Sequence, residues 1–365
     1  MKTSNVTSPN NTPALASTQK SDSLKKKEHS PAVLGTIFGL IAAIAYTAAN
    51  IALREAATDN NIDWAIWISA LKSVPATIVA WGLVIYRGSQ GLPSLPPRQL
   101  IIPFILTGLV MQFGGNVMLQ WSFSMGGLAL SVPLCFATLL TTGALLGRIF
   151  LNESITYRMF VSMVVLTAAI VILSMGAHQA EESVYAHMKH HTNSMATVAL
   201  TIFAACFAGC AYGVGGAVIR GSVREKLSIS ATLVLISTTG LVCLTGTAIY
   251  RLGFSIFWET TAWQYLVMLM AGLMNAIAFF SIGAAMKYLT VTRVNLLNAS
   301  QTAMAAFAGV LCFGEELTVW LLSGTALTIG GLFLMEKKSP TIPNNTSLNT
   351  SALDVKQLEV KSNGS

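Results

Sequence analysis

The sequence predicts an all-α integral membrane protein with ten transmembrane helices arranged as two inverted five-helix repeats. The first observation is a shortage of charge: 10% of the 365 residues are charged and 53% are hydrophobic, whereas a soluble domain carries roughly a quarter charged residues. The second is that apolar residues gather in segments of about 20, the length that a helix needs to cross the hydrocarbon core. The third is that similar sequences recur in the two halves of the chain.

Ten apolar segments meet this length requirement. They are apolar on all sides rather than along one stripe, which disfavours a large soluble helical core. Five of the nine gaps between them are short, so the helices that these gaps join must run antiparallel. The expected spans are residues 32–53, 64–86, 99–120, 126–148, 157–176, 196–219, 229–250, 263–284, 290–313 and 317–335.

Lysine and arginine are distributed unevenly between the two sides of these spans. One side carries Lys20, Lys25, Lys26, Lys27, Arg87, Arg98, Arg148, Arg158, Arg220, Arg224, Lys226, Lys287, Lys337 and Lys338, and the other carries Arg54, Lys189 and Arg251. Because cytoplasmic loops are enriched in these residues, we expect a multi-pass protein of the cell inner (plasma) membrane with both termini in the cytoplasm. The net charge of +7 is then a topology signal rather than a nucleic-acid-binding surface.

The polar ends and one long gap define the expected domains. The ends are rich in Ser, Thr, Asn and Lys, a composition typical of disorder. The expected division is a disordered cytoplasmic N-terminal tail (1–30), a first five-helix repeat (31–177), a periplasmic histidine-rich loop (178–195), a second five-helix repeat (196–337) and a disordered cytoplasmic C-terminal tail (338–365).

Three pairs of similar segments indicate the repeat. They are "FLNESIT" (150–156) with "CFGEELT" (312–318), "VIYRG" (84–88) with "AIYRLG" (248–253), and "AAIAYTAANIALR" (42–54) with "AGCAYGVGGAVIR" (208–220). The pairs keep the same order, and their offsets are nearly constant at 162, 164 and 166 residues. Because each repeat has an odd number of spans, the second enters the membrane from the opposite side. Inverted repeats of this kind let secondary transporters expose one central site alternately to each side.

The chain also resembles the EamA-type family of the drug/metabolite transporter superfamily over about residues 32–337. The resemblance is carried by the junctions "IFLNESIT" and "LCFGEELT" and by the helices "VVLTAAIVIL" and "TALTIGGLFLM" that follow. It implies an inner-membrane exporter or importer of small solutes, with spans one, three, four, six, eight and nine around a central cavity. It also carries the family's junction acid over to Glu153 and Glu315. The family usually has a proline upstream of each junction acid, where this sequence has Leu140 and Thr302.

No energy-coupling domain is visible in the sequence, since the chain lacks the glycine-rich phosphate loop of ATPases. We therefore expect a secondary transporter of small polar metabolites or drugs that works by alternating access, is gradient-driven or facilitated, uses no cofactor and is not an enzyme. The alternatives are an integral-membrane scaffold, receptor or enzyme without transport activity; a channel is disfavoured. The expected partners are a small-molecule substrate and the lipid bilayer, with no nucleic acid, and a homodimer is left open.

Polar side chains inside apolar spans usually face a cavity or another helix, because exposure to lipid is costly. In span three, Gln112, Asn116 and Gln120 recur every four residues and so share one helix face. Such a ladder of amides suits hydrogen bonding to a polar solute, and interhelical bonding is the alternative. The expected substrate-cavity residues are Tyr46, Asn50, Gln112, Asn116, Gln120, Tyr212, Asn275, Asn295, Asn298 and Gln301.

Lys72 is an isolated charge within span two. Near mid-bilayer it could pair with an anionic substrate or take part in proton coupling. The alternative is that the side chain extends outward to the polar loop at 54–63, where water or Asp63 would hold the ammonium group. Span two is not a usual cavity helix in the family, so the sequence favours this alternative.

The junction acids Glu153 and Glu315 each precede a new helix, where a carboxylate can face the positive end of the dipole and accept unpaired N–H groups. In an inverted pair they lie at opposite membrane faces, too far apart to act together, so we interpret Glu315 as a structural or gate-edge residue. Glu316 is expected to be an exposed charge. The loop at 178–193 could bind zinc through His187, His190 and His191. No second cluster supports this, and no metal site is predicted.

Overall fold

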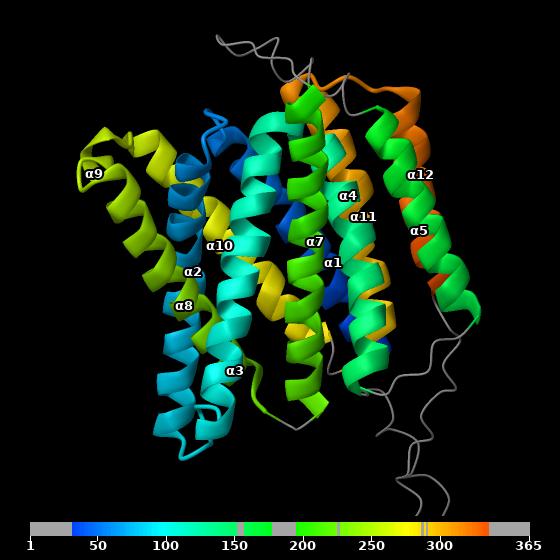
Figure 1. Cartoon of the computed structure of the whole chain (residues 1–365). Helices are drawn as coiled ribbons and strands as arrows, with labels where there is room; N and C mark the ends of the chain where they lie inside the picture. Colours follow the sequence, from blue (N-terminus) through cyan, green and yellow to red (C-terminus); the bar gives the residue numbers. More distant parts are fainter. Residues whose placement is uncertain are drawn as a thin grey trace, which may run out of the picture.

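The computed structural model describes residues 31–151, 157–176, 195–224, 227–285, 288–289 and 291–335, and every regular element within them is a helix (Figure 1). In chain order the elements are α1 (Pro31–Ala56), α2 (Ile62–Ser89), α3 (Arg98–Leu109), the π-helix η1 (Val110–Val117), α4 (Met118–Leu151), α5 (Tyr157–Met175), α7 (Met195–Arg224), α8 (Ile229–Leu252), α9 (Ile256–Glu259), α10 (Ala262–Ala285), α11 (Val291–Phe313) and α12 (Val319–Met335). The predicted tails and residues 178–194 of the predicted loop lie outside the described residues.

Six helices in the described part of the chain are long and apolar enough to cross a membrane, and three shorter apolar helices accompany them. The long ones cover Ala32–Ala56, Ile62–Ser89, Arg98–Phe150, Met195–Ser222, Ser230–Leu252 and Ala262–Ala285, and the short ones cover Phe160–Leu173, Ser300–Phe313 and Val319–Gly331. Large apolar side chains such as Ile78, Val164 and Phe307 are exposed on the outside of the bundle. Such a surface is stable against lipid, and it supports the multi-pass membrane protein that the sequence predicts.

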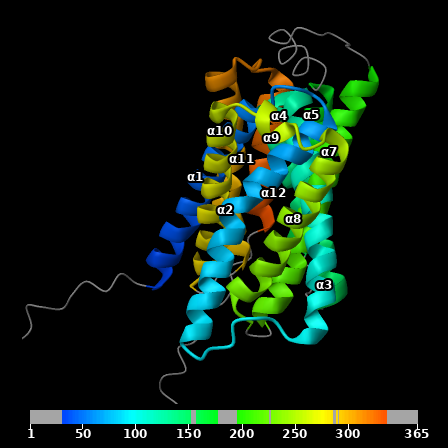
Figure 2. The same ribbon diagram turned by 90° about the vertical axis from the view of Figure 1, so that its left-hand side faces the viewer.

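The bundle has two ends that differ in structure (Figures 1 and 2). One end, called the Arg54 end below, contains the loop 57–61 after α1, the short helix α9 and the link 314–318 between α11 and α12. It is uppermost in Figure 1. The opposite end contains the loop 90–97 between α2 and α3 and the C-terminus of α7.

The predicted break between spans three and four is a kink inside one long helical run rather than a loop. Helix α4 continues from η1 to Leu151, and its axis is interrupted at Gly127, where φ is 72° and ψ is −177°. This conformation is almost exclusive to glycine, because a Cβ atom would collide with the backbone. The chain therefore crosses the bundle through α3, η1 and the first part of α4, turns at Gly127, and returns through the second part.

The largest buried cluster lies toward the Arg54 end. Each of four helices contributes a fully buried side chain from its part nearest that end: Leu53 from α1, Trp67 from α2, Phe123 from α4 and Met268 from α10. Close packing elsewhere depends on small residues. At Gly209 of α7 a Cβ atom would overlap Thr138 Oγ1 and the carbonyl of Cys135 in α4, so α7 and α4 approach backbone to backbone.

Candidate functional site

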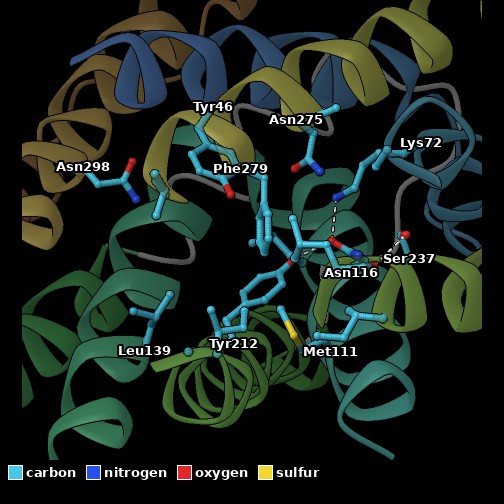
Figure 3. A pocket seen from close by; sticks show the side chains of 18 of the residues that line it. Tyr46, Lys72, Met111, Asn116, Leu139, Tyr212, Ser237, Asn275, Phe279 and Asn298 are labelled. Atoms are coloured by element: carbon cyan, nitrogen blue, oxygen red, sulfur yellow. Dashed lines mark hydrogen bonds between the residues drawn. The ribbon is translucent and has the colours of Figure 1, made fainter. Parts of the chain in front are cut away.

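A cavity of about 270 Å³ lies inside the bundle and is lined by side chains from α1, α2, η1, α4, α7, α8, α10 and α11 (Figure 3). Its polar lining residues are Tyr46, Asn50, Lys72, Gln112, Asn116, Tyr212, Ser237, Asn275, Asn298 and Gln301. Aromatic and aliphatic side chains such as Met111, Phe136 and Phe279 fill the wall between them. A mostly apolar cavity with a few convergent polar groups is the usual form of a small-molecule site.

Hydrogen bonds join the polar groups on one side of the cavity into a chain (Figure 3). Lys72 Nζ and the Tyr212 hydroxyl both donate to Asn116 Oδ1, each over 2.6 Å. Asn116 Nδ2 in turn donates to Gln112 Oε1, and Gln112 Nε2 donates to the carbonyl of Ile236 at 3.4 Å. Three helices and η1 are therefore connected through Asn116, whose amide orientation is fixed by donors on one side and an acceptor on the other.

The sequence places the amides of Gln112, Asn116 and Gln120 on one helix face, but the π-helix η1 turns Gln120 away from the other two. Gln112 and Asn116 line the cavity, but Gln120 does not: its Nε2 donates to the carbonyl of Leu53 at 2.8 Å. Regular 3.6-residue spacing would align positions four apart, whereas a π-helix closes its hydrogen bonds over five residues and rotates the following residues. The prediction that Gln120 lines the cavity is therefore wrong.

Lys72 extends into the cavity instead of toward the polar loop. Its side chain is 4% exposed and is the only charged one among the described lining residues. The expected alternative partner, Asp63, instead accepts two bonds from Arg251, at 3.0 and 3.2 Å. Because that acid is occupied at the surface, the interpretation of Lys72 as an outward-reaching surface cation is wrong, and α2 is a cavity helix.

The remaining candidates fall into two groups. Tyr46, Asn50, Asn275, Asn298 and Gln301 line the cavity, and their role in binding a solute stays a prediction. Asn298 is notable because its Oδ1 atom is buried without a hydrogen-bond partner in the described part of the chain. The second group has no described side chain: Asn295 lies on α11 but its side chain is outside the described residues, as is the whole of Glu153.

Several lining residues were not predicted. Ser237 and Ile236 bring α8 into the site, and Phe279 and Phe280 contribute aromatic surface from α10. Apolar residues in a membrane span carry no local signal that separates a cavity wall from a lipid-facing surface. Ser237 could have been noticed as a polar residue within a span, but its hydroxyl donates to the Leu233 carbonyl of its own helix.

Glu315 lies outside the cavity and caps a helix other than the one that follows it. Its two carboxylate oxygens accept the backbone N–H groups of Leu128 at 2.8 Å and Ala129 at 2.7 Å. These are the first residues after the Gly127 kink, so Glu315 caps the second part of α4. The sequence position of Glu315 had suggested a cap on α12, the helix that follows it, and that expectation is wrong. The same carboxylate pairs with Arg54 Nε at 3.3 Å, and both side chains are buried. Glu316 is exposed, as predicted.

The kink and the acid depend on each other. A Cβ atom on Gly127 would overlap the Glu315 carboxylate, and a Cβ atom on Gly309 would overlap the same group. The carboxylate therefore occupies space left by two glycines, one from α4 and one from α11. The negative charge satisfies N–H groups that the kink leaves without intrahelical partners.

A dense set of contacts closes the Arg54 end above the cavity. Trp67 Nε1 donates to Thr260 Oγ1 at 2.9 Å, and its ring packs edge-on against Phe257 with centroids 5.0 Å apart. Trp64 Nε1 donates to the carbonyl of Ala56 at 2.9 Å. Toward the opposite end, the lining residues Ile219, Leu233 and Gly283 reach almost to the ends of α7, α8 and α10. The cavity thus extends away from the Arg54 end.

These features define a class: a multi-pass helical membrane protein whose bundle encloses a mostly apolar cavity with a few convergent polar groups. Residues 199–336 match the model of the EamA-like transporter family. The match confirms the resemblance for the part of the chain that contains the junction "LCFGEELT", and it identifies this segment as EamA-like.

The other comparisons concern the fold. None of the curated proteins matches the chain. A solved structure titled "Crystal structure of protein" matches with a TM-score of 0.50 and 14% sequence identity, covering 82% of this chain and 95% of that chain. At this identity the likeness shows a shared fold alone.

Proposed function

We propose that the protein is a secondary transporter that moves small polar metabolites or drugs across the membrane by alternating access, with the cavity as its substrate site. The observation that carries the proposal is the asymmetry of the cavity. A cavity with a few convergent polar groups lies in the middle of the bundle. Buried contacts close it toward the Arg54 end, and its lining extends toward the opposite end. An alternating-access protein in one of its two states has this form.

The proposal includes ten spans in two inverted five-helix repeats. Support for the number comes from the six long apolar helices, one of which is divided at Gly127, and from the three shorter ones. Support for the symmetry comes from helix packing. Helix α1 packs on α10 and α11, α7 packs on η1 and α4, and the equivalent helices α2 with α8 and α5 with α12 pack on each other. A pseudo-two-fold axis requires this pattern: the contacts of α1 with the second half must match those of α7 with the first half, and helices that the axis interchanges can pack on each other.

In the mechanism, the Arg54–Glu315 pair and the cap on α4 hold the Arg54 end closed. Opening that end would separate α11 from α4 and expose the buried carboxylate. The hydration of Arg54 and Glu315 would then replace the lost contacts, which keeps the two states close in free energy. The substrate would bind within the cavity and leave after the two halves rock about it.

Flux measurements in proteoliposomes test the function. The purified chain is reconstituted and assayed with amino acids, drugs, nucleosides and organic acids, with and without a pH gradient. We expect saturable flux of at least one solute, reduced at least tenfold by Asn116→Ala because that change breaks the hydrogen-bond chain in the cavity. Absence of flux for every solute, together with turnover of one of them, would favour the membrane-enzyme alternative.

Topology is tested separately. In a variant whose five native cysteines are replaced by serine, a cysteine is placed at Asp59 in the loop of the Arg54 end or at Ser94 in the loop of the opposite end. With both termini in the cytoplasm of the inner membrane, a membrane-impermeant maleimide added to intact spheroplasts labels position 59 and not position 94. The reverse pattern would show that the orientation is inverted.

A further inference from the structure

The cavity contains a buried cation, Lys72, that no acid in the described part of the chain neutralises. Lys72 is the only charged residue among the described lining residues, and the one hydrogen bond it makes there is to the neutral Asn116. An ammonium group has three donors, so two remain for other partners. A charge buried without a counter-ion is unfavourable in a low-dielectric environment, and an anionic ligand group beside Nζ would relieve that cost.

A second polar group among the residues that line the cavity is an acceptor without a hydrogen-bond partner in the described part of the chain. Asn298 Oδ1 is buried and makes no hydrogen bond within the described part of the chain. Figure 3 shows Asn298 and Lys72 on opposite sides of the cavity. A buried unpaired carbonyl oxygen is unfavourable unless a donor reaches it, and a rotation of the Asn298 amide toward the cavity would let a ligand N–H or O–H group serve as that donor.

Aromatic side chains lie between these two polar groups. Tyr46, Phe279 and Tyr212 occupy the space between Lys72 and Asn298 in the view of Figure 3. Their rings offer apolar faces to a flat or hydrophobic body. The Tyr212 hydroxyl is already used as a donor to Asn116.

We propose that the substrate is an organic anion with an apolar body and a hydrogen-bond donor at its far end, and that Lys72 binds the anionic group while Asn298 accepts from the donor. The proposal rests on the proposed transport function and names the substrate class of the same site. Lys72 sets charge selectivity, and Asn298 selects for the distal donor. Neutral isosteres and organic cations are poor ligands because they leave Nζ without a counter-ion.

Three small probes separate the two recognition groups. 4-Aminobenzoate carries both the anion and the distal donor, benzoate lacks the donor, and 4-aminobenzamide keeps the donor but lacks the charge. Their dissociation constants are measured by equilibrium dialysis with the full chain in detergent. We expect 4-aminobenzoate to bind about ten- to a hundredfold more tightly than 4-aminobenzamide, the range of a hydrogen bond to a charged group.

Variants assign the preference to residues. Lys72→Gln should abolish the advantage of the carboxylate over the amide, and Lys72→Arg should restore most of it. Asn298→Leu should remove the advantage of 4-aminobenzoate over benzoate and leave the carboxylate preference intact. Arg251→Gln, which removes a cation from the surface rather than from the cavity, is the matched control and should change neither ratio. Melting temperatures of all variants report folding.

The outcomes are distinguishable from those of the flux assay. Equal binding of carboxylate and amide by the folded wild-type chain overturns the inference, and so does an unchanged ratio in folded Lys72→Gln. If organic carboxylates of this size do not bind at all, the inference is also overturned. If organic carboxylates do not bind but a neutral solute shows saturable flux, the proposed transport function is still supported.

Discussion

Replacement of Glu315 by glutamine is the sharpest test of the structure at the Arg54 end. The carboxylate accepts two backbone N–H groups at the kink of α4 and pairs with Arg54. Glutamine keeps the shape of the glutamate side chain but has only one acceptor oxygen. Its NH₂ group must therefore face one of the two backbone N–H donors, and Arg54 loses its counter-ion. Hydrogen bonds to a charged group contribute about 1.5–3 kcal/mol each, and breaking a buried ion pair costs about 3–5 kcal/mol.

From these terms we expect Glu315→Gln to lower the free energy of unfolding by about 3 kcal/mol. The measurement is unfolding by sodium dodecyl sulfate in mixed micelles, followed by tryptophan fluorescence. The matched control is Glu316→Gln, at the neighbouring exposed position, where we expect a change of at most about 1 kcal/mol because interactions of an exposed charge contribute little.

A double-mutant cycle with Arg54→Gln isolates the ion pair. Because Glu315 and Arg54 contact each other directly, the two changes should be non-additive by about 1 kcal/mol or more. The reasoning is refuted if Glu315→Gln and Glu316→Gln are equally stable, or if the effects of Glu315→Gln and Arg54→Gln simply add.

Three further substitutions follow from the contacts of the closed end, each measured by the same unfolding assay. Gly127→Ala should destabilise by about 1–3 kcal/mol because alanine cannot adopt this backbone conformation without strain, whereas Gly143→Ala, with open space around it, should not. Trp67→Phe should cost about 1 kcal/mol through loss of its hydrogen bond to Thr260. Asp63→Asn should cost less than about 1 kcal/mol, and the loss should vanish in high salt, because the partner of Asp63 at this surface is largely exposed.

The sequence located most of the cavity through polarity alone. Tyr46, Asn50, Gln112 and Asn116 were picked out because polar side chains are rare in apolar spans, and all four line the cavity. Such residues must face away from lipid wherever the helix lies, so the inference needs no knowledge of its neighbours. The inference failed at Gln120, where a π-helix changed the residue spacing within the span.

Residues that act through distant partners could not be assigned from the sequence. The position of Glu315 suggested a cap on the helix that follows it, yet it caps a helix that begins 187 residues earlier in the chain. Asp63 lies near the start of the same helix as Lys72 and looked like its partner. Instead Asp63 accepts a hydrogen bond from Arg251, 188 residues away in the chain. The sequence around an acid does not show which distant donor or cation will lie closest to it after folding.

The sequence by itself determined the membrane class, the all-helical structure and the EamA-like resemblance, because each transmembrane segment must be apolar and satisfy its own backbone hydrogen bonds whatever surrounds it. Tertiary structure alone decided which polar residues meet. It turned Lys72 into the cavity, left Asn298 Oδ1 without a partner among the described residues, and placed the Glu315 carboxylate in the space left by Gly127. The physical reason is that apolarity is a property of one segment, whereas the partner of a buried charge depends on how all the helices pack.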